Sequence, residues 1–299
     1  NHTIRFGKSQ LTVEKGRNIT NSVTMATDTD TIAYSSNKTA VATVNSSTGS
    51  VTGVAAGTAT ISAVVTNAKG VEITDAAKSY SVEVADAYKI VLKTPSGAMT
   101  AGTATDISAT VYQYDAENGY TAYKQNVTIT WQAYRDGIAA FDGETKSKAV
   151  TTTTRTGSSS VTLYTYSTGT SKTSVSVPLT VSVVIGGTTY TAADASVEVS
   201  PAEAASFSVQ EDTAFDEDDF STAVDAATGR YAGKLASISI SDTTGGSVYD
   251  GNGRVSTGTK YYISGSRSYL ISNLSFKTST SSSSSPYFLY VGYDTDGNI

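Results

Sequence analysis

The chain has 299 residues, a formal net charge of −6 and a pI near 4.9. This acidic balance argues against a nucleic-acid or anionic-membrane partner, because both need a basic patch. The sequence contains no cysteine, which excludes disulfides, thiolate metal sites and cysteine nucleophiles. No run approaches the roughly 18 apolar residues of a membrane span. The opening residues, NHTIRF, show no signal-peptide pattern, so we interpret the chain as a segment of a longer protein.

The composition favours a mainly β fold. Only 16% of residues are charged, and Thr, Val, Tyr and Ser dominate instead. Branched and aromatic side chains suit a pleated, half-buried surface. At roughly 100–150 residues per domain, the length predicts two or three domains, each large enough for its own core.

Residues 1–85 alternate strand-like runs with turn signals at a spacing of about 8–12 residues, which is typical of a β-sandwich. The run TIAYSSNKTAVATVNSSTGSVTGVAAGTATISA and the closing YSVEV are similar to the bacterial immunoglobulin-like domain of group 2. The resemblance covers about residues 9–85 and implies an immunoglobulin-like sandwich. That family usually carries a tryptophan two residues before the Ser-Ser pair; here Ala33 takes that place, with Tyr34 beside it.

Residues 86–200 begin a second series of candidate strands. Trp131, the only tryptophan, lies in the middle of VTITWQAY, and Ile129 shares its face by the two-residue period. A tryptophan on a central strand is a core feature of immunoglobulin folds. In this pattern the region resembles invasin-type bacterial immunoglobulin-like domains, which implies a second sandwich. We interpret SVSVPLTVSVVI as an edge strand able to pair with another chain, with Pro178 guarding against such pairing.

Residues 201–299 contain the one convincing helix, within EDTAFDEDDFSTAVDAATG. Asp216 or Asp218 is expected to cap it, and Gly229 to end it. Strand-like runs follow, among them LISNLSFKT at residues 270–278, up to YFLYVGYD. The stretches GGSVYDGNGRVSTGTKYY, ISNLSFKT and YVGYDTDGN resemble a repeat of large Firmicutes surface proteins that accompanies S-layer homology domains, and also cadherin-like bacterial repeats. In such repeats another strand follows, so we interpret this module as truncated.

The predicted architecture is therefore two tandem immunoglobulin-like β-sandwiches, at residues 1–85 and 86–200, followed by a β-rich module with one short helix at 201–299. The linkers at residues 85–87 and 200–202 are short. Short linkers imply a rod with restricted hinges.

The sequence predicts no enzyme and no catalytic residue. His2 is the only histidine and lies at a terminus expected to fray, so no Ser-His-Asp triad forms in the interior. The acidic residues at the start of the helix are interpreted as a dipole-stabilised cap in preference to a glycosidase carboxylate pair.

One motif suits a metal ion. Asp294, Asp296 and Asn298 form D-x-D-G-N, which places oxygen ligands at alternate positions beside a glycine. Ca²⁺ takes six to eight oxygen ligands, so calcium is the one cofactor that the sequence suggests, although the fold requires none. The alternative is a plain hairpin turn, the commoner use of Asp-Gly between strands.

Tyrosines are abundant, at 19 against 7 phenylalanines. Tyr112, Tyr114, Tyr120 and Tyr123 cluster in the second module and are the candidates for a ligand-binding patch, because exposed tyrosine stacks on sugars and anchors interfaces. The alternative, and the commoner role, is that they fill sandwich edges with their hydroxyls in water.

These observations predict a non-catalytic structural stalk or adhesive segment of an extracellular bacterial surface protein. Its partner would be a host or cell-wall glycan or protein, or a second copy of the chain. Folded sandwiches in series give reach without the entropy of a loose chain. The alternative is an accessory, spacer or carbohydrate-binding region of a large secreted polysaccharide-degrading enzyme, because the fold alone does not fix the function.

Overall fold

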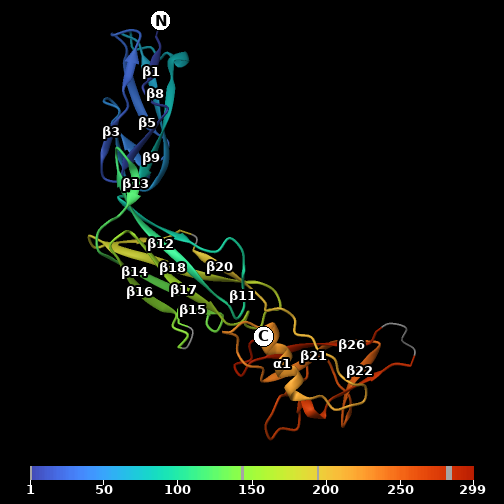
Figure 1. Ribbon diagram of the computed structural model, residues 1–299. Helices are drawn as coiled ribbons and strands as arrows, with labels where there is room; N and C mark the ends of the chain where they lie inside the picture. Colours follow the sequence, from blue (N-terminus) through green and yellow to red (C-terminus); the bar gives the residue numbers. More distant parts are fainter. Residues whose placement is uncertain (1, 143–144, 194, 281–284) are drawn as a thin grey trace. The chain divides into compact units, whose positions relative to one another are not determined.

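The computed structural model describes residues 2–142, 145–193, 195–280 and 285–299, and within them the fold is mainly β (Figure 1). The described strands pair within residues 1–85, within 86–200 or within 201–299. By compactness the chain forms two units. The first comprises residues 1–91, 110–125 and 155–157, and the second residues 92–109, 126–154 and 158–299. The predicted division into three domains stays a prediction.

Residues 1–85 form a four-stranded sheet ordered β2-β9-β8-β5, a three-stranded sheet β3-β7-β6 and the pair β1-β4. The bounds are β1 Ile4–Phe6, β2 Gln10–Glu14, β3 Asn18–Thr20, β4 Val23–Met25, β5 Thr31–Ser36, β6 Ala42–Val44, β7 Ser50–Gly53, β8 Gly57–Thr66 and β9 Lys78–Ala85. Strands β2 and β9 run parallel, in register from Gln10↔Ser81 to Glu14↔Ala85.

The core of this region follows the two-residue period of its strands. Along β8, Ala59, Ile61, Ala63 and Val65 are buried and the residues between them are not. The buried Tyr34 fills the place beside Ala33. Its ring leaves no room for a side chain at Gly49, where a Cβ would lie 2.8 Å from the ring and φ is +72°. Glycine is therefore required in this loop between β6 and β7 by backbone and packing alike.

Residues 86–200 form two further sheets, β10-β12-β17-β15 with β13 on β12, and β11-β20-β18-β14-β16 with β19 on β18. The bounds are β10 Tyr88–Lys93, β11 Met99–Thr100, β12 Ala104–Asp115, β13 Gly119–Ala122, β14 Val127–Ala133, β15 Ala139–Ala140, β16 Ala149–Thr154, β17 Ser158–Thr165, β18 Val175–Ile185, β19 Thr188–Thr191 and β20 Ser196–Ser200.

Trp131 on β14 is fully buried, as predicted, and its indole N–H donates a 2.8 Å hydrogen bond to Thr152 Oγ1. The interpretation of β18 as an edge strand is wrong. It lies between β20 and β14, paired through Val177↔Val197 and Trp131↔Val181. Pro178 is in register with Ser196 inside the sheet. The run is strongly apolar because it is central.

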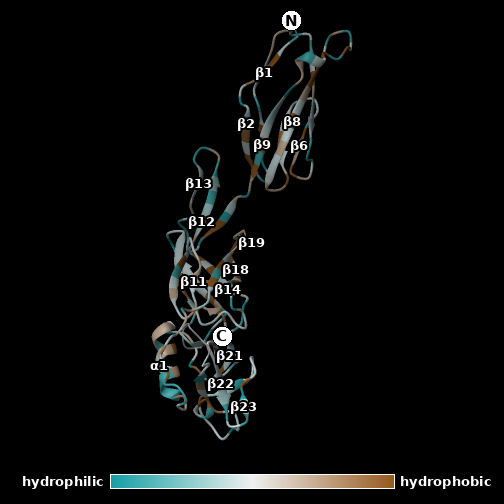
Figure 2. Ribbon diagram, turned by 90° about the vertical axis from the view of Figure 1, so that its right-hand side faces the viewer, coloured by the Kyte–Doolittle hydropathy of each residue, from teal (hydrophilic) through white to brown (hydrophobic). Residues whose placement is uncertain are grey.

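Residues 201–299 form two three-stranded sheets, β24-β21-β26 and β23-β22-β25. The bounds are α1 Glu217–Ala227, β21 Ser237–Thr244, β22 Gly246–Asp250, β23 Gly253–Arg254, β24 Lys260–Tyr262, η2 Ile271–Asn273, β25 Ser275–Thr278 and β26 Tyr287–Tyr293. Helix α1 begins as predicted, with the Asp216 carboxylate accepting from Asp218 N–H, and its hydrophilic start is teal in Figure 2. Phe220 is its one buried residue and packs into an aromatic core with Phe215 and Phe276.

Candidate functional site

The four candidate tyrosines lie on one hairpin, formed by β12 and β13 in the first unit. Tyr114 is directly opposite Tyr120, and Tyr112 is opposite Ala122. Each of the four side chains is half-buried. The turn is closed by the Asp115 carboxylate, which accepts the N–H groups of Glu117 and Asn118 at 2.9 Å. The structure brings the Tyr114 and Tyr120 rings together at a centroid distance of 5.3 Å, and none of the four tyrosines is fully exposed. Ligand binding by these residues stays a prediction.

The hairpin rests on the linker that follows β9. Tyr120 Oη donates a 2.8 Å hydrogen bond to the carbonyl of Asp86, and Tyr114 N–H donates one of 2.8 Å to the carbonyl of Ala87. The Tyr123 ring contacts the Tyr88 ring edge-on at a centroid distance of 5.1 Å. We call these contacts between residues 86–89 and residues 112–123 the tyrosine brace.

A cation completes the tyrosine brace. Lys89 Nζ lies 3.8 Å from the centre of the Tyr120 ring and 5.7 Å from that of Tyr112. A cation over an aromatic face contributes about 0.5–2 kcal/mol, depending on desolvation. Burial, followed by the nearby negative charge of Asp86, raises the pKa of Tyr120 to about 12. The hydroxyl is therefore a proton donor at neutral pH, which the bond to the Asp86 carbonyl requires.

The D-x-D-G-N motif forms a tight turn held by its first residue. Asp294 Oδ1 accepts the N–H groups of Asp296 and Asn298 at 2.9 and 2.8 Å, and Oδ2 accepts from Asn298 Nδ2 at 3.2 Å. Among the described residues, no group of three or more His, Cys, Asp or Glu side chains could hold a metal ion. This geometry is that of a tight turn closed by an aspartate side chain. Calcium binding at Asp294, Asp296 and Asn298 stays a prediction.

The expectation that His2 frays is wrong. Its Nδ1 lies 2.8 Å from Asp30 Oδ2, and the Asp30 side chain is 3% exposed. A buried carboxylate needs a hydrogen-bonding partner, and His2 supplies one. The sequence gives no signal for this contact, because the two residues are 28 positions apart.

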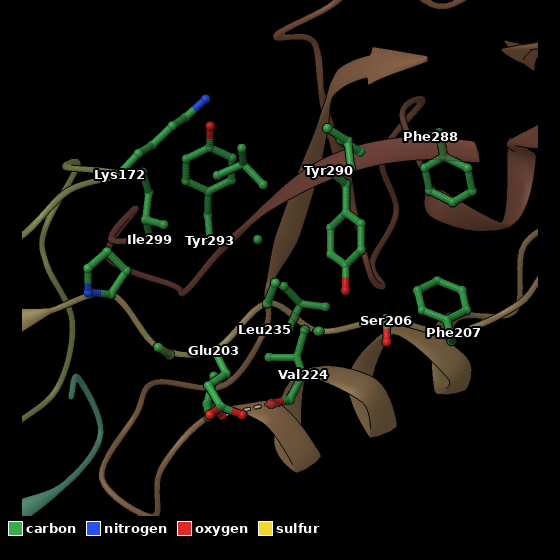
Figure 3. A pocket seen from close by; sticks show the side chains of 18 of the residues that line it. Lys172, Glu203, Ser206, Phe207, Val224, Leu235, Phe288, Tyr290, Tyr293 and Ile299 are labelled. Carbon is green, nitrogen blue, oxygen red and sulfur yellow. Dashed lines mark hydrogen bonds between the residues drawn. The ribbon is translucent and has the colours of Figure 1, made fainter. Parts of the chain in front are cut away.

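The second unit contains a groove of about 870 Å³ that sequence reasoning missed. One wall is β26 and the other is the segment 201–209, with Val224 of α1 and Leu235 on the floor (Figure 3). Most of the lining is apolar, and Phe207, Phe288 and Tyr290 meet at one end, with ring centroids 6.1–6.5 Å apart. This volume lies within the range of ligand sites, about 300–1,000 Å³.

The comparisons with known proteins identify one part of the chain. The sequence profile of the bacterial Ig-like domain (group 2) matches residues 2–74. Domains of this family occur in surface proteins and are typically non-catalytic. No curated protein matches the chain. In the described part of the chain, no helix has the length and apolar character needed to cross a membrane.

The solved structures that the chain matches are distant in sequence. They include the fibronectin(III)-like modules of Clostridium thermocellum CbhA, at 13% identity over 67% of this chain and 94% of that one, with a TM-score of 0.23. Escherichia coli alpha-2-macroglobulin matches at 10% identity over 69% and 17%, with a TM-score of 0.30. Parabacteroides merdae beta-glucuronidase matches at 15% over 67% and 24%, with a TM-score of 0.21. This chain thus spans less than a quarter of alpha-2-macroglobulin and about a quarter of the glucuronidase.

Proposed function

We propose that this chain is a non-catalytic structural segment of an extracellular bacterial protein, in which folded β modules act as a spacer. The observation that carries the proposal is the tyrosine brace. A short linker limits the number of conformations, and side chains that bond to its main chain limit them further. A stalk needs such a junction, because a free hinge would lose the reach that folded modules provide.

Composition and family likeness support the same function. Residues 2–74 match a family found in surface proteins. The low charge and the absence of cysteine fit an extended β protein that does not depend on redox state. This role does not depend on the type of parent protein. A spacer is useful in an adhesin, in a surface-layer protein and in a secreted polysaccharide-degrading enzyme.

Pulsed electron paramagnetic resonance tests the proposal within the first unit. Because the sequence contains no cysteine, Ser47→Cys and Glu117→Cys would carry the only two spin labels, both at exposed positions. We expect one narrow distance distribution, broadened by Tyr120→Ala. Tyr134→Ala is the matched control, because Tyr134 is 53% exposed and lies outside the tyrosine brace. A broad distance distribution in the labelled chain that keeps Tyr120 would contradict a spacer role.

The predicted ligand-binding role of Tyr112, Tyr114, Tyr120 and Tyr123 is a separate proposal. Their half-burial against the linker leaves less ring surface for a sugar than a free hairpin would. Screening a glycan array with the wild-type chain and with Tyr112→Ala tests it. Binding that Tyr112→Ala removes, with the label distances unchanged, would add adhesion to the spacer function.

A further inference from the structure

Strand β26 is the last strand of its sheet. It pairs with β21 along one edge, from Tyr287↔Thr244 to Tyr293↔Ser237. Among the described residues, its other edge makes no main-chain hydrogen bond. An open edge is a ready template for another strand. Leu289, which lines the groove beside this edge, is 50% exposed.

The facing wall is a strand-like segment without a partner. Ala205, Phe207 and Val209 are half-buried, whereas Ser206 and Ser208 between them are exposed, which is the two-residue period of a strand. No residue from Pro201 to Val209 makes a hydrogen bond to another described residue. Because these residues are half-buried or exposed, their main-chain groups are accessible to a further strand.

The two walls run antiparallel. Glu203 lies at the Tyr293 end of β26, and Phe207 lies beside Tyr290 and Phe288 (Figure 3). They line the same groove without bonding to each other. The groove therefore lies between two strand-like edges whose main-chain groups do not bond to each other.

We propose that this groove binds an extended peptide segment of a separate polypeptide, which inserts as a β-strand between β26 and residues 201–209. Its main chain would bond to both walls, and its alternate apolar side chains would cover Val224 and Leu235 on the floor. In such strand addition, main-chain hydrogen bonds provide the affinity, and side chains on one face of the strand provide the specificity. An acyl chain would cover the same floor but leave both walls unpaired.

Charge at the groove ends describes the peptide further. Of the four charged residues that line it, three are acidic and only Lys172 is basic. Glu203 and Asp294 lie toward one end, and Glu211, which accepts the Thr278 N–H at 2.9 Å, lies toward the other. Hydrogen bonds from Thr278 lower the pKa of Glu211, so its charge is present at neutral pH. A strand with apolar residues at alternate positions and a lysine at each end is complementary.

The probe is the acetylated, amidated peptide KTVTVTVTK, whose seven central residues match the length of β26. Fluorescence polarisation should show saturable binding to the full chain. Amide hydrogen exchange followed by NMR should slow at every second residue of β26 and of residues 203–208, because strand hydrogen bonds alternate between the two edges. The peptide KTVTPTVTK, which lacks one N–H, should bind at least about tenfold more weakly.

Two adjacent substitutions give a matched pair. Ala205→Pro and Ser206→Pro each remove an N–H that makes no hydrogen bond within the described chain, so neither costs the fold a bond. Successive N–H groups of a strand point to opposite edges. One of the two variants should therefore weaken binding about tenfold or more, and the other less than about twofold.

Three results would overturn the proposal. The first is no binding of KTVTVTVTK at millimolar concentration. The second is binding without amide protection, or with equal loss in both proline variants, which would indicate a side-chain-only apolar ligand. The third is protection of the same amides in the peptide-free chain that disappears on dilution, which would identify a second copy as the occupant. None of these results bears on the tyrosine brace, which lies in the other unit.

Discussion

The Tyr120 hydroxyl donates a 2.8 Å hydrogen bond to the main-chain carbonyl of Asp86, 34 positions earlier in the sequence. The acceptor belongs to the backbone, so no substitution at Asp86 removes it. Tyr120 is therefore the residue through which the linker can be loosened with the least change elsewhere.

Alkaline pH should loosen this contact. The pKa of Tyr120 is about 12 in the fold and 10.0 ordinarily. A group with a raised folded pKa contributes stability that is complete below the unfolded value and is lost as pH rises through the folded one. We expect the spin-label distribution between positions 47 and 117 to broaden between pH of about 10 and 12. Tyr120→Phe should show a pH-independent distribution over that interval, and an identical broadening in both proteins would contradict the assignment.

Removing the Tyr80 hydroxyl should stabilise the first unit. Tyr80 is 3% exposed, and its hydroxyl is buried with no hydrogen-bond partner in the described chain. An unsatisfied buried donor costs about 1–3 kcal/mol. Tyr80→Phe should therefore raise the free energy of unfolding by about 1 kcal/mol in urea titrations. Tyr34→Phe, on the neighbouring core tyrosine, is the comparison, and a loss of stability in Tyr80→Phe would show that the hydroxyl is satisfied.

Gly229→Ala should destabilise the second unit. A Cβ at Gly229 would lie 2.1 Å from the carbonyl oxygen of Gly102, so one of the two backbone segments would have to move. Overpacking of this kind costs about 1–3 kcal/mol. Urea unfolding measures the loss. The control is Gly251→Ala, whose added Cβ meets nothing within 4 Å; equal effects of the two substitutions would refute the packing argument.

Acid should weaken the contact between β22 and β24. Tyr261 Oη donates a 2.7 Å hydrogen bond to Asp250 Oδ2, and this bond, with the Asn252 N–H, lowers the pKa of Asp250 below its ordinary 3.8. A lowered carboxyl pKa gives stability that is present above the unfolded value and lost as pH falls through the folded one. Between pH of about 5 and 2, the melting temperature should fall less in Tyr261→Phe than in the wild type.

The calcium hypothesis has a direct test. If Asp294, Asp296 and Asn298 bind the ion, calcium at about 100 times its dissociation constant should stabilise the second unit by about 2.7 kcal/mol. Asp294→Asn keeps an oxygen for the two main-chain hydrogen bonds of the turn but removes the charge and the acceptor of Asn298 Nδ2. It should therefore abolish the gain at a small cost to the calcium-free melting temperature. A melting temperature equal in millimolar calcium and in chelator would eliminate the site.

Local patterns were enough for most of the fold. The cap at Asp216, the buried Trp131 and the Gly49 hairpin each depend on neighbours within a few residues, so their signals are in the sequence. Residues 174–185 show where prediction from local patterns fails. The same apolar run is compatible with a central strand and with an unprotected edge strand. Residues 270–274 were expected to be strand and contain η2 instead, since Leu274 and Ile271 are buried together there.

The candidate site depends on contacts that the sequence does not reveal. The clustering of tyrosines was visible, but their partners, the linker residues 86–87 and the start of β10 at Tyr88 and Lys89, were not. The groove was missed because its defining property is the absence of pairing along residues 201–209. Strand signals in that segment are weak, because Phe207 and Val209 are its only large apolar residues.

The parallel pairing of β2 with β9 has a mechanical consequence. These are the first long strand and the last strand of residues 1–85, and they are in register over Gln10–Glu14 and Ser81–Ala85. A tensile load applied to the two ends of this region pulls the strands along their length in opposite directions, so the bonds between them are sheared together instead of being peeled off one by one. Forced unfolding is governed by the unfolding barrier, and shearing loads several bonds at that barrier at once. Residues 1–85 should therefore resist a pull on their two ends better than their equilibrium stability alone would indicate.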